Sequence, residues 1–594
     1  MNNKNYQNVL PVLPDSPRIR VYPFASGRLR YLFHYVRHGI KRIGLLLVSG
    51  LMYFAVPAQD LTHFSQNTSS FSGSVSTMAG FYNASGMEPR RDPFNGVISG
   101  NFNVNLKGFD MPFSFVYSNQ NKSFRQPFNQ FGLSPKYKWV TLHLGYRNVN
   151  FSKYVLGSHT FFGIGTELNP GKFRFGLVYG RLKRATNKAV NVFHPQNDTL
   201  SDYKRKMVSM KIGVGTSKNY FDINLLKAVD DSTSVGEEFR QEGIFPEANL
   251  VAGVHGKIGI AENLSFETEA AYSIYTANQN SAVEFDLPGF AGKIIPINLS
   301  TRGHLAVESK LDYRDKKGLN LGLHYRRIDP DYRSMGTYFI QNDVENYTLK
   351  TGFTALKNKM QVGGSIGLER NNLKSARNAT THKTIGSLNI NYNPTTKFGI
   401  TANYSNYSIN QQAGRVQIAD SVKLYQTNGS LTLAPHFSFQ NKNKNLTHYI
   451  SLTYTQMHLS DKNPQSVYQN NFTTTNNILS YNLGFAKSRI NVSTSMQYNK
   501  IRMVNSTSTN KGMSLAVNKR LKKPSMSLTL NLNYLQQTGE LQSTHSLTPG
   551  LNITTVIKKQ HQIRFKINMI TNRNDLSGTS TTEQFADLRY VFNF

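Results

Sequence analysis

Segments with an apolar residue at every second position follow one another from about Tyr137 to Phe594, and tight turns alternate with longer polar connections between them. The brief connections include Pro170-Gly171-Lys172 and Lys522-Lys523-Pro524. The long ones include residues 185–204, 230–246, 277–301, 329–344 and 410–423. A chain that turns tightly at one end of its strands and loosely at the other predicts a closed, antiparallel up-and-down β-barrel.

The individual segments favour a membrane barrel over a soluble β-sandwich or propeller. Residues 525–534 place Met526, Leu528, Leu530, Leu532 and Tyr534 on one face and Ser, Thr and Asn on the other. Side chains alternate across a strand, so each segment has one apolar and one polar face. Strands of soluble proteins average about five or six residues, whereas membrane strands need roughly 9–11. Most segments here reach that membrane length.

The last predicted strand has a characteristic aromatic ending. The sequence Tyr590-Val591-Phe592-Asn593-Phe594 resembles the C-terminal strand of Gram-negative outer-membrane proteins, whose final aromatic residue belongs to the insertion signal. The body of the chain resembles large outer-membrane barrels of Bacteroidota, some of which serve protein secretion or nutrient import. The resemblance implies an outer-membrane location and contact with the barrel-insertion machinery.

The N-terminal region predicts a leader followed by a signal peptide. Arg37, Lys41 and Arg42 precede an apolar run that ends in Val56-Pro57-Ala58. A basic region, an apolar stretch and small residues before the cleavage site are typical of secretory signals. A membrane anchor is the alternative, although the run is short for a spanning helix. We therefore divide the chain into a leader and signal peptide (1–58), an N-terminal periplasmic or partial-plug segment (59–93) and the barrel (94–594).

The number of strands is predicted with one ambiguity. Before Tyr137, residues 94–106 and 111–120 form a candidate hairpin, and residues 71–84 are a weaker strand candidate. Including all three gives an odd total, whereas single-chain bacterial barrels have an even number. Setting residues 71–84 aside gives about 24 strands, within a range of 22 to 26.

Charge and composition exclude several classes of protein. The chain has 68 Lys and Arg residues against 34 Asp and Glu, a net charge of +34. These charges are scattered, without a basic helix, zinc module or aromatic RNA-binding motif, so no nucleic-acid partner is predicted. Lipid and lipopolysaccharide of the outer membrane are the expected anionic neighbours, and plain solvated surface is the alternative. The chain has no cysteine, which excludes disulfides and thiol catalysis.

The polar strand faces predict a charged lumen. Barrels of 22 strands in outer-membrane transporters are filled by a plug domain, and the chain before Tyr137 is too short for one. The barrel must then be closed by infolded loops, by the short N-terminal segment, or by a lipoprotein or periplasmic partner. The predicted lumen-lining residues are Glu308, Lys310, Arg314, Arg326, Arg564, Lys566 and Arg589.

Three segments interrupt the rhythm of turns and loops with aromatic or apolar residues, and they are the candidates for gating or partner binding. The first, residues 121–136, is expected on the side of the tight turns. The second and third are the long connections 329–343 and 277–301. The aromatic candidates in the first two are Phe124, Phe128, Phe131, Tyr332, Tyr338 and Phe339.

Catalytic motifs are missing from the sequence. It has no nucleophile elbow, no zinc-binding His-Glu-x-x-His helix and no phosphate-binding glycine loop before a helix. We therefore predict no enzyme activity, no cofactor and no metal. Two hypotheses remain: a pore or translocator for solute, polymer or protein, gated by inward loops or a partner, and a surface scaffold or adhesin that presents its long loops to a partner.

Overall fold

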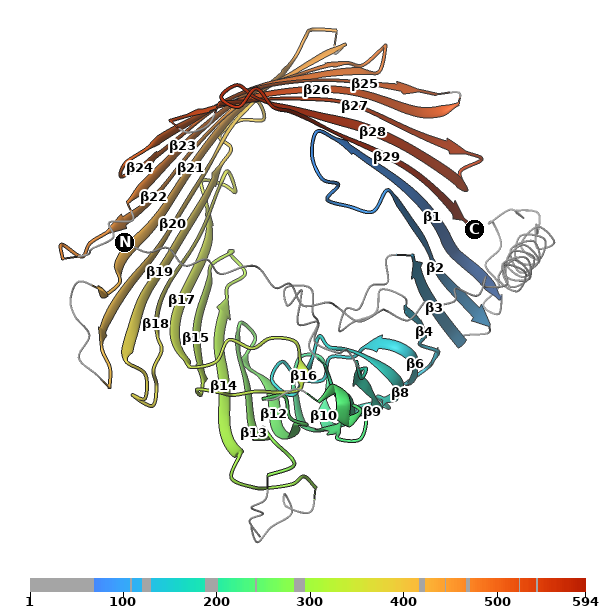
Figure 1. Ribbon diagram of the computed structural model, residues 1–594, viewed down its shortest axis with the longest axis vertical. Helices are drawn as coiled ribbons and strands as arrows, with labels where there is room; N and C mark the ends of the chain where they lie inside the picture. Colours follow the sequence, from blue (N-terminus) through green and yellow to red (C-terminus); the bar gives the residue numbers. More distant parts are fainter. Residues whose placement is uncertain are drawn as a thin grey trace, which may run out of the picture. The chain divides into compact units, whose positions relative to one another are not determined.

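The strands close into one antiparallel barrel (Figure 1). The computed structural model describes residues 69–106, 109–119, 130–186, 201–240, 243–281, 294–415, 422–443, 445–465, 471–522, 524–540 and 543–594. Each wall strand pairs with the strands next to it in the chain, and the first strand pairs with the last, which closes the ring. The predicted closed, all-β, up-and-down architecture is confirmed. Within the described ranges, no helix is long and apolar enough to cross a bilayer.

The elements follow a simple order along the chain. They are β1 (Ser70–Ser85), β2 (Phe94–Leu106), β3 (Phe109–Ser118), β4 (Gln130–Leu133), β5 (Lys136–Tyr137), β6 (Val140–Asn148), β7 (Leu156–Gly157), β8 (Thr160–Leu168), β9 (Phe173–Lys183), β10 (Lys204–Gly215), β11 (Tyr220–Asp231), η2 (Glu237–Phe239), β12 (Ala248–Ala261), β13 (Leu264–Thr276), β14 (Thr301–Arg314), β15 (Asn320–Ile328), β16 (Gly336–Thr337), β17 (Val344–Ala355), β18 (Met360–Arg370), β19 (Ala379–Tyr392), β20 (Phe398–Ala413), β21 (Tyr425–Gln440), β22 (Leu446–Asp461), β23 (Phe472–Phe485), β24 (Ile490–Met503), β25 (Thr507–Leu521), β26 (Ser525–Gly539), β27 (Ser543–Ile557), β28 (His561–Asn574) and β29 (Ser580–Asn593).

The barrel has 26 strands, at the upper end of the predicted range. The main sheet contains 27 segments, but β4 and β5 both lie between β3 and β6 and are two pieces of one strand. Pro135 stands in the gap between them, where its missing N–H group interrupts the ladder of hydrogen bonds. The remaining small sheet, β7 with β16, is not part of the wall.

Two expectations about the N-terminal part are corrected. Residues 71–84, which parity had led us to set aside, form β1, a wall strand paired with both β2 and β29. The barrel therefore includes residues that we had assigned to an N-terminal periplasmic or plug segment (59–93). The strand that the sequence did not reveal is the broken β4–β5. The predicted leader and signal peptide (1–58) lie outside the described residues.

The extra strand also changes the position of the connection after β3. The barrel has a turn end, where β1 begins and β29 finishes, and a loop end, which carries the long connections. Because β3 runs toward the loop end and β4–β5 runs back, the connection between them lies at the loop end, contrary to our expectation of the turn side. Of its aromatic candidates, Phe131 is in β4, while Phe124 and Phe128 lie outside the described residues.

The seam between β1 and β29 is sealed at the turn end by backbone and aromatic contacts. The Gly73 amide donates to the Phe594 carbonyl (3.0 Å), and the Phe594 amide donates to the Gly73 carbonyl (3.1 Å). The Phe594 ring stacks on Phe71 with ring centroids 4.6 Å apart and lies 5.7 Å from the Phe102 ring. The terminal aromatic residue is therefore part of the closed wall.

Candidate functional site

The two faces of the wall differ as the alternation predicted. On β14, Leu305 points outward and is 39% exposed, while its neighbours His304 and Ala306 are buried on the inner side. Outward-facing Leu323, Ile366, Leu530 and many similar side chains are also exposed. An exposed apolar band on the outside of a closed barrel is the arrangement of a membrane-spanning β-barrel, because its outer face contacts lipid.

Two connections from the loop end fold into the barrel and meet there. Residues 149–159 follow β6, and residues 329–343 follow β15. Leu156 and Gly157 of the first pair in parallel with Gly336 and Thr337 of the second, forming β7 and β16 inside the wall (Figure 1). We call these two segments the infolded loops.

Side-chain hydrogen bonds join the infolded loops to each other. The Tyr332 hydroxyl donates to the Tyr154 carbonyl (2.8 Å), and the Ser334 hydroxyl donates to the Val155 carbonyl (2.6 Å). Burial raises the pKa of the Tyr332 phenol well above its usual range, so this hydroxyl stays protonated and able to donate. The two loops therefore act as one packed unit.

This unit has its own hydrophobic core against the inner wall. Tyr154, Val155, Leu156, Tyr332 and Met335 are buried. They pack on wall residues that include Val178, Leu226, Val251, Ala271, Ala306 and Ile328. Burying a large apolar side chain contributes about 1.5–3 kcal/mol, so five such residues provide a substantial driving force for docking.

Glycines allow the loops to approach the wall closely. A Cβ atom at Gly253 of β12 would lie 2.8 Å from Val155 Cγ2, and one at Gly336 would lie 2.4 Å from the Val155 carbonyl oxygen. Both distances are shorter than side chains tolerate, so each position requires glycine for the docked arrangement.

Two wall carboxylates anchor the first infolded loop. Glu308 on β14 accepts a hydrogen bond from the Tyr154 hydroxyl (2.7 Å) and pairs with the ammonium groups of Lys153 and, at 3.2 Å, Lys310. Glu269 on β13 accepts hydrogen bonds from the Tyr154 amide (3.2 Å) and the Ser152 hydroxyl. Burial, together with the hydrogen bond to Glu308, raises the pKa of the Tyr154 phenol well above its usual range.

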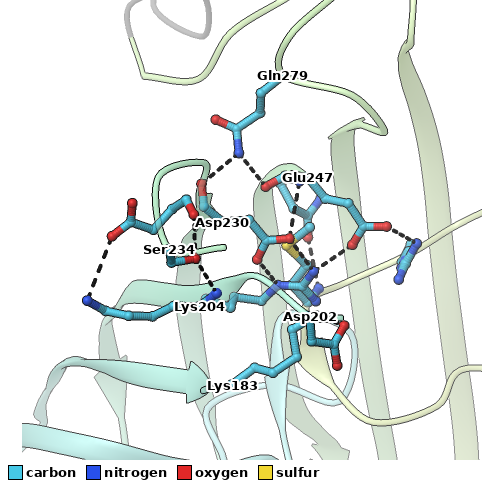
Figure 2. Close-up of polar contacts among 12 residues, drawn as sticks. Lys183, Asp202, Lys204, Asp230, Ser234, Glu247 and Gln279 are labelled. Atoms are coloured by element: carbon cyan, nitrogen blue, oxygen red, sulfur yellow. Dashed lines mark hydrogen bonds and ion pairs between the residues drawn. The ribbon is translucent and has the colours of Figure 1, made fainter. Parts of the chain in front are cut away.

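A second polar cluster holds the other infolded loop at the loop end (Figure 2). The Arg205 guanidinium donates to both carboxylate oxygens of Asp230 (2.7 and 2.9 Å) and to Glu247 (2.5 Å). Arg333 of the infolded loop pairs with the same Glu247 at 3.0 Å. The Gln279 amide caps the cluster by donating to the carbonyls of Asp230 and Glu247 (2.9 and 2.8 Å). Although burial disfavours the charge on Glu247, Arg205 and Arg333 hold the pKa of its carboxyl below its usual range.

Comparisons with known proteins do not assign the chain to a family. No protein-family model and no curated protein matches the sequence. Among solved structures, the chain is similar to the P pilus usher (PapC) translocation pore, with a TM-score of 0.34 and 10% identity over 88% of this chain and 98% of that one. It is also similar to OccAB2 of Acinetobacter baumannii (TM-score 0.30, 8% identity, 88% and 98% covered) and to OccK11 of Pseudomonas aeruginosa (0.30, 11%, 59% and 94%). The closed ring of paired strands and the exposed apolar outer face are themselves the arrangement of a large membrane-type β-barrel.

The predicted lumen residues of β14 and β15 are on the inner face of the barrel. Glu308 and Lys310 belong to the anchor of the infolded loops. Arg326 pairs with Glu369 of β18 at 3.4 Å, and Arg314 donates to the Asn320 side chain (3.0 Å) near the turn end.

The other three predicted lumen residues lie on β28 and β29. Among the described residues, these strands contribute nothing to the hydrophobic core of the infolded loops. Arg564 and Arg589 are direct cross-strand partners, and Lys566 lies opposite Asp587. Arg589 donates to the Ser76 hydroxyl (3.0 Å) across the seam. These residues are far along the chain from Glu308, and the contacts divide the seven predicted lumen residues into two groups.

The predicted gating aromatics have different environments. Tyr332 is buried in the core of the infolded loops, while Tyr338 is half exposed, stacks on His159 with ring centroids 4.0 Å apart and accepts a hydrogen bond from the Thr160 amide (2.9 Å). Phe339 is 84% exposed. Phe131 lies in the wall, where its ring contacts Tyr146.

The third predicted segment, residues 277–301, does not join the inner core with its described part. Ile295 is buried against Ala248 and is flanked by Leu250 and Ile274. These wall residues alternate with the inward-facing Asn249 and Ser273, so the described residues around Ile295 cover the outer side of the wall.

The inner wall from β20 to β27 is chemically different from the loop-bearing wall. Its lumen-facing positions carry mostly Ser, Thr and Asn, which bond to one another, as between Ser495 and Ser514 (2.6 Å) and between Asn518 and Thr529 (2.7 Å). Within the described strands β20–β27, only Asp461 and Arg520, at opposite ends of the barrel wall, place charges on this face. We call this surface the neutral wall.

The first infolded loop was missed as a functional segment. Residues 149–156 read Val-Asn-Phe-Ser-Lys-Tyr-Val-Leu, which is too apolar for a solvated connection. This apolar composition could have identified the segment as one that packs inside the barrel. The acceptors of its hydrogen bonds, Glu269 and Glu308, lie more than a hundred residues away in the sequence, and spacing alone does not reveal such contacts.

Proposed function

We propose that the protein is an outer-membrane pore or translocator whose lumen is gated by the two infolded loops. The observation that carries the proposal is the packed core of these loops inside the barrel. A barrel that served only to present loops outward would have no use for five buried apolar residues and two carboxylate anchors on its inner wall. The charged inner wall around Glu308 holds the loops, and the neutral wall faces the passage.

The chemistry of the neutral wall indicates what passes. Hydroxyl and amide groups exchange hydrogen bonds with polar, uncharged groups without requiring a counter-charge. A cargo sliding along this wall would be a neutral polar solute or polymer, such as a glycan or an extended peptide. The exposed Phe339 is positioned to contact cargo or a lipoprotein or periplasmic partner that completes closure.

Conductance in planar bilayers tests the proposal. We expect the purified barrel to conduct weakly, and replacement of residues 331–341 by a short Gly-Ser linker to increase single-channel conductance. Shortening the connection 575–579, whose hydrogen bonds and ion pairs reach only neighbouring wall strands, is the matched control and should leave conductance unchanged. Baseline current from both the intact barrel and the 331–341 variant would refute a pore.

A surface scaffold is the second candidate, because residues 294–297, in the described part of the third predicted segment, pack on the outer side of the wall at the loop end. Mild-detergent purification of the barrel, with and without the described outer segment 294–300, distinguishes the two. A partner lost only when this segment is replaced would favour the scaffold.

A further inference from the structure

Three basic side chains gather on the outer face of β24 and β25 near the loop end. Lys500 and Arg502 are two residues apart on β24 and share its outward face with the exposed Met496. Lys511 of β25 lies directly opposite Tyr498, which makes it the diagonal neighbour of Lys500. Same-face neighbours along a strand are about 7 Å apart, and diagonal neighbours about 7–8 Å.

These three cations have no protein counter-charge in the part of the chain that the structure describes. Among the described residues, no carboxylate forms an ion pair with Lys500, Arg502 or Lys511. Glu540 follows β26 at the same end and makes no ion pair with them, and Asp575 is engaged by His545 (2.7 Å) and Arg573 (3.8 Å) on the neighbouring strands. Like charges held this close repel one another, and an anion with several oxygens would relieve that repulsion.

An apolar groove lies below the basic cluster on the same outer wall. It has a volume of about 490 Å³ and is lined by outward side chains of β25–β28, including Leu515, Leu530, Leu532, Leu551 and Met569. Leu515 is four residues further from the loop end than Lys511 on one strand, a distance of about 14 Å. Pro549 also lines the groove.

The combination of a cationic cluster above an apolar groove matches an amphiphile with a phosphorylated head and acyl chains. We propose that the outer wall of β24–β28 is a binding site for a phosphorylated glycolipid of the outer leaflet. The Lys500, Arg502 and Lys511 side chains bind its phosphate, and the groove takes one acyl chain. The proposal rests on the outer-membrane location proposed above and does not depend on conduction.

The two outer grooves differ in whether the basic side chains above them are already paired with carboxylates. A second outer groove, of about 540 Å³, is lined by residues of β13–β18 such as Leu323 and Leu349. The arginines above it, Arg327 and Arg370, already pair with Glu345 at 3.8 and 2.6 Å. Of these two grooves, only the one on β25–β28 therefore has unpaired basic side chains above it that could bind a phosphate.

Binding of purified lipid A to the detergent-solubilised barrel, followed by native mass spectrometry and titration, tests the site. Each basic residue near an anionic membrane surface contributes about 1 kcal/mol, so the triple variant Lys500→Gln, Arg502→Gln, Lys511→Gln should bind on the order of 100-fold more weakly. Lys519→Gln, at the turn end of β25, is the matched control and should bind as the unmodified barrel does. Heat-modifiable migration on gels verifies that each variant is folded.

Three further arms identify the ligand class. Lipid A without its phosphates should bind the unmodified barrel as weakly as lipid A binds the triple variant. Leu532→Trp, which fills the groove, should weaken binding of lipid A but not of its deacylated headgroup. Equal affinity of the triple variant and the unmodified barrel would overturn the site, and equal dependence of phosphatidylglycerol binding on the three residues would overturn the choice of a glycolipid.

Discussion

Removing the Glu308 carboxylate should undock the infolded loops without opening the wall. Glu308→Ala deletes the acceptor of the Tyr154 hydroxyl and the partner of Lys153. Tyr154→Phe deletes only the hydroxyl. The two single variants and the double variant form a thermodynamic cycle that isolates the Tyr154–Glu308 hydrogen bond.

The expected size follows from the contacts. A hydrogen bond to a charged group contributes about 1.5–3 kcal/mol. The Lys153 ammonium is 52% exposed, so its ion pair adds at most about 1 kcal/mol. Glu308→Ala should therefore weaken docking by about 2–4 kcal/mol, which lowers the docking equilibrium constant about 30- to 1000-fold. The coupling energy in the cycle should be about 1.5–3 kcal/mol.

Hydrogen exchange measured by mass spectrometry provides the readout. Amides of the infolded loops, such as that of Met335, which donates to the Asn249 side chain (2.9 Å), should exchange faster in Glu308→Ala while the wall strands remain protected. Glu262→Gln is the control, because its ion pair with Lys316 at the turn end is almost fully solvated. Unchanged loop exchange in Glu308→Ala, or a coupling energy near zero, would refute the anchoring role of this carboxylate.

Three other perturbations have definite expected outcomes. Gly253→Val should displace the first infolded loop, because even a Cβ atom would lie 2.8 Å from Val155; overpacking costs about 1–3 kcal/mol, and conductance should rise without loss of the folded barrel. Burial lowers the pKa of His159 to about 4, below its usual 6.5, so the docked state holds the neutral ring. Docking should therefore be constant above pH 6.5 and weaken as the pH falls toward 4. Hydrogen-exchange rates of the infolded loops should show this pH dependence in the unmodified barrel but not in His159→Gln. Arg205→Leu leaves buried carboxylates without their partner, which costs about 3–5 kcal/mol, and the heat-modifiability transition of the barrel should move to lower temperature.

The wall of the barrel was predictable because period-two alternation is a local property. Residues 525–534, for example, lie within β26, with Leu530 and Leu532 exposed on the outside as expected. The β4–β5 strand was not predicted, because Pro135 divides it into pieces too short to show alternation of apolar and polar residues. The discarded β1 shows the limit of parity: an odd count reveals an error without revealing whether a strand is surplus or missing.

The sequence predicted one of the two infolded loops but not the partner on which it docks. The composition of residues 329–343 indicated a segment that avoids water, and Tyr332 is indeed buried. Its docking partner was not predictable, because the contact between the infolded loops joins residues about 180 positions apart, such as Ser334 and Val155. The register of eight intervening strands decides which wall residues face them, and a sequence read one strand at a time does not supply that register.

The seam between β1 and β29 has a consequence for how the barrel assembles. Every other wall contact joins strands that are neighbours in the chain, so most of the barrel can grow hairpin by hairpin. The Gly73–Phe594 contact spans nearly the whole described chain. Loop-closure entropy grows only as about (3/2)RT ln n, so this one distant contact adds a modest thermodynamic cost. A chain that lacks either terminal strand would keep almost all of its local pairings and still present two open sheet edges. The pairing of β1 with β29 is thus the one wall contact between described strands that the growth of hairpins along the chain does not supply.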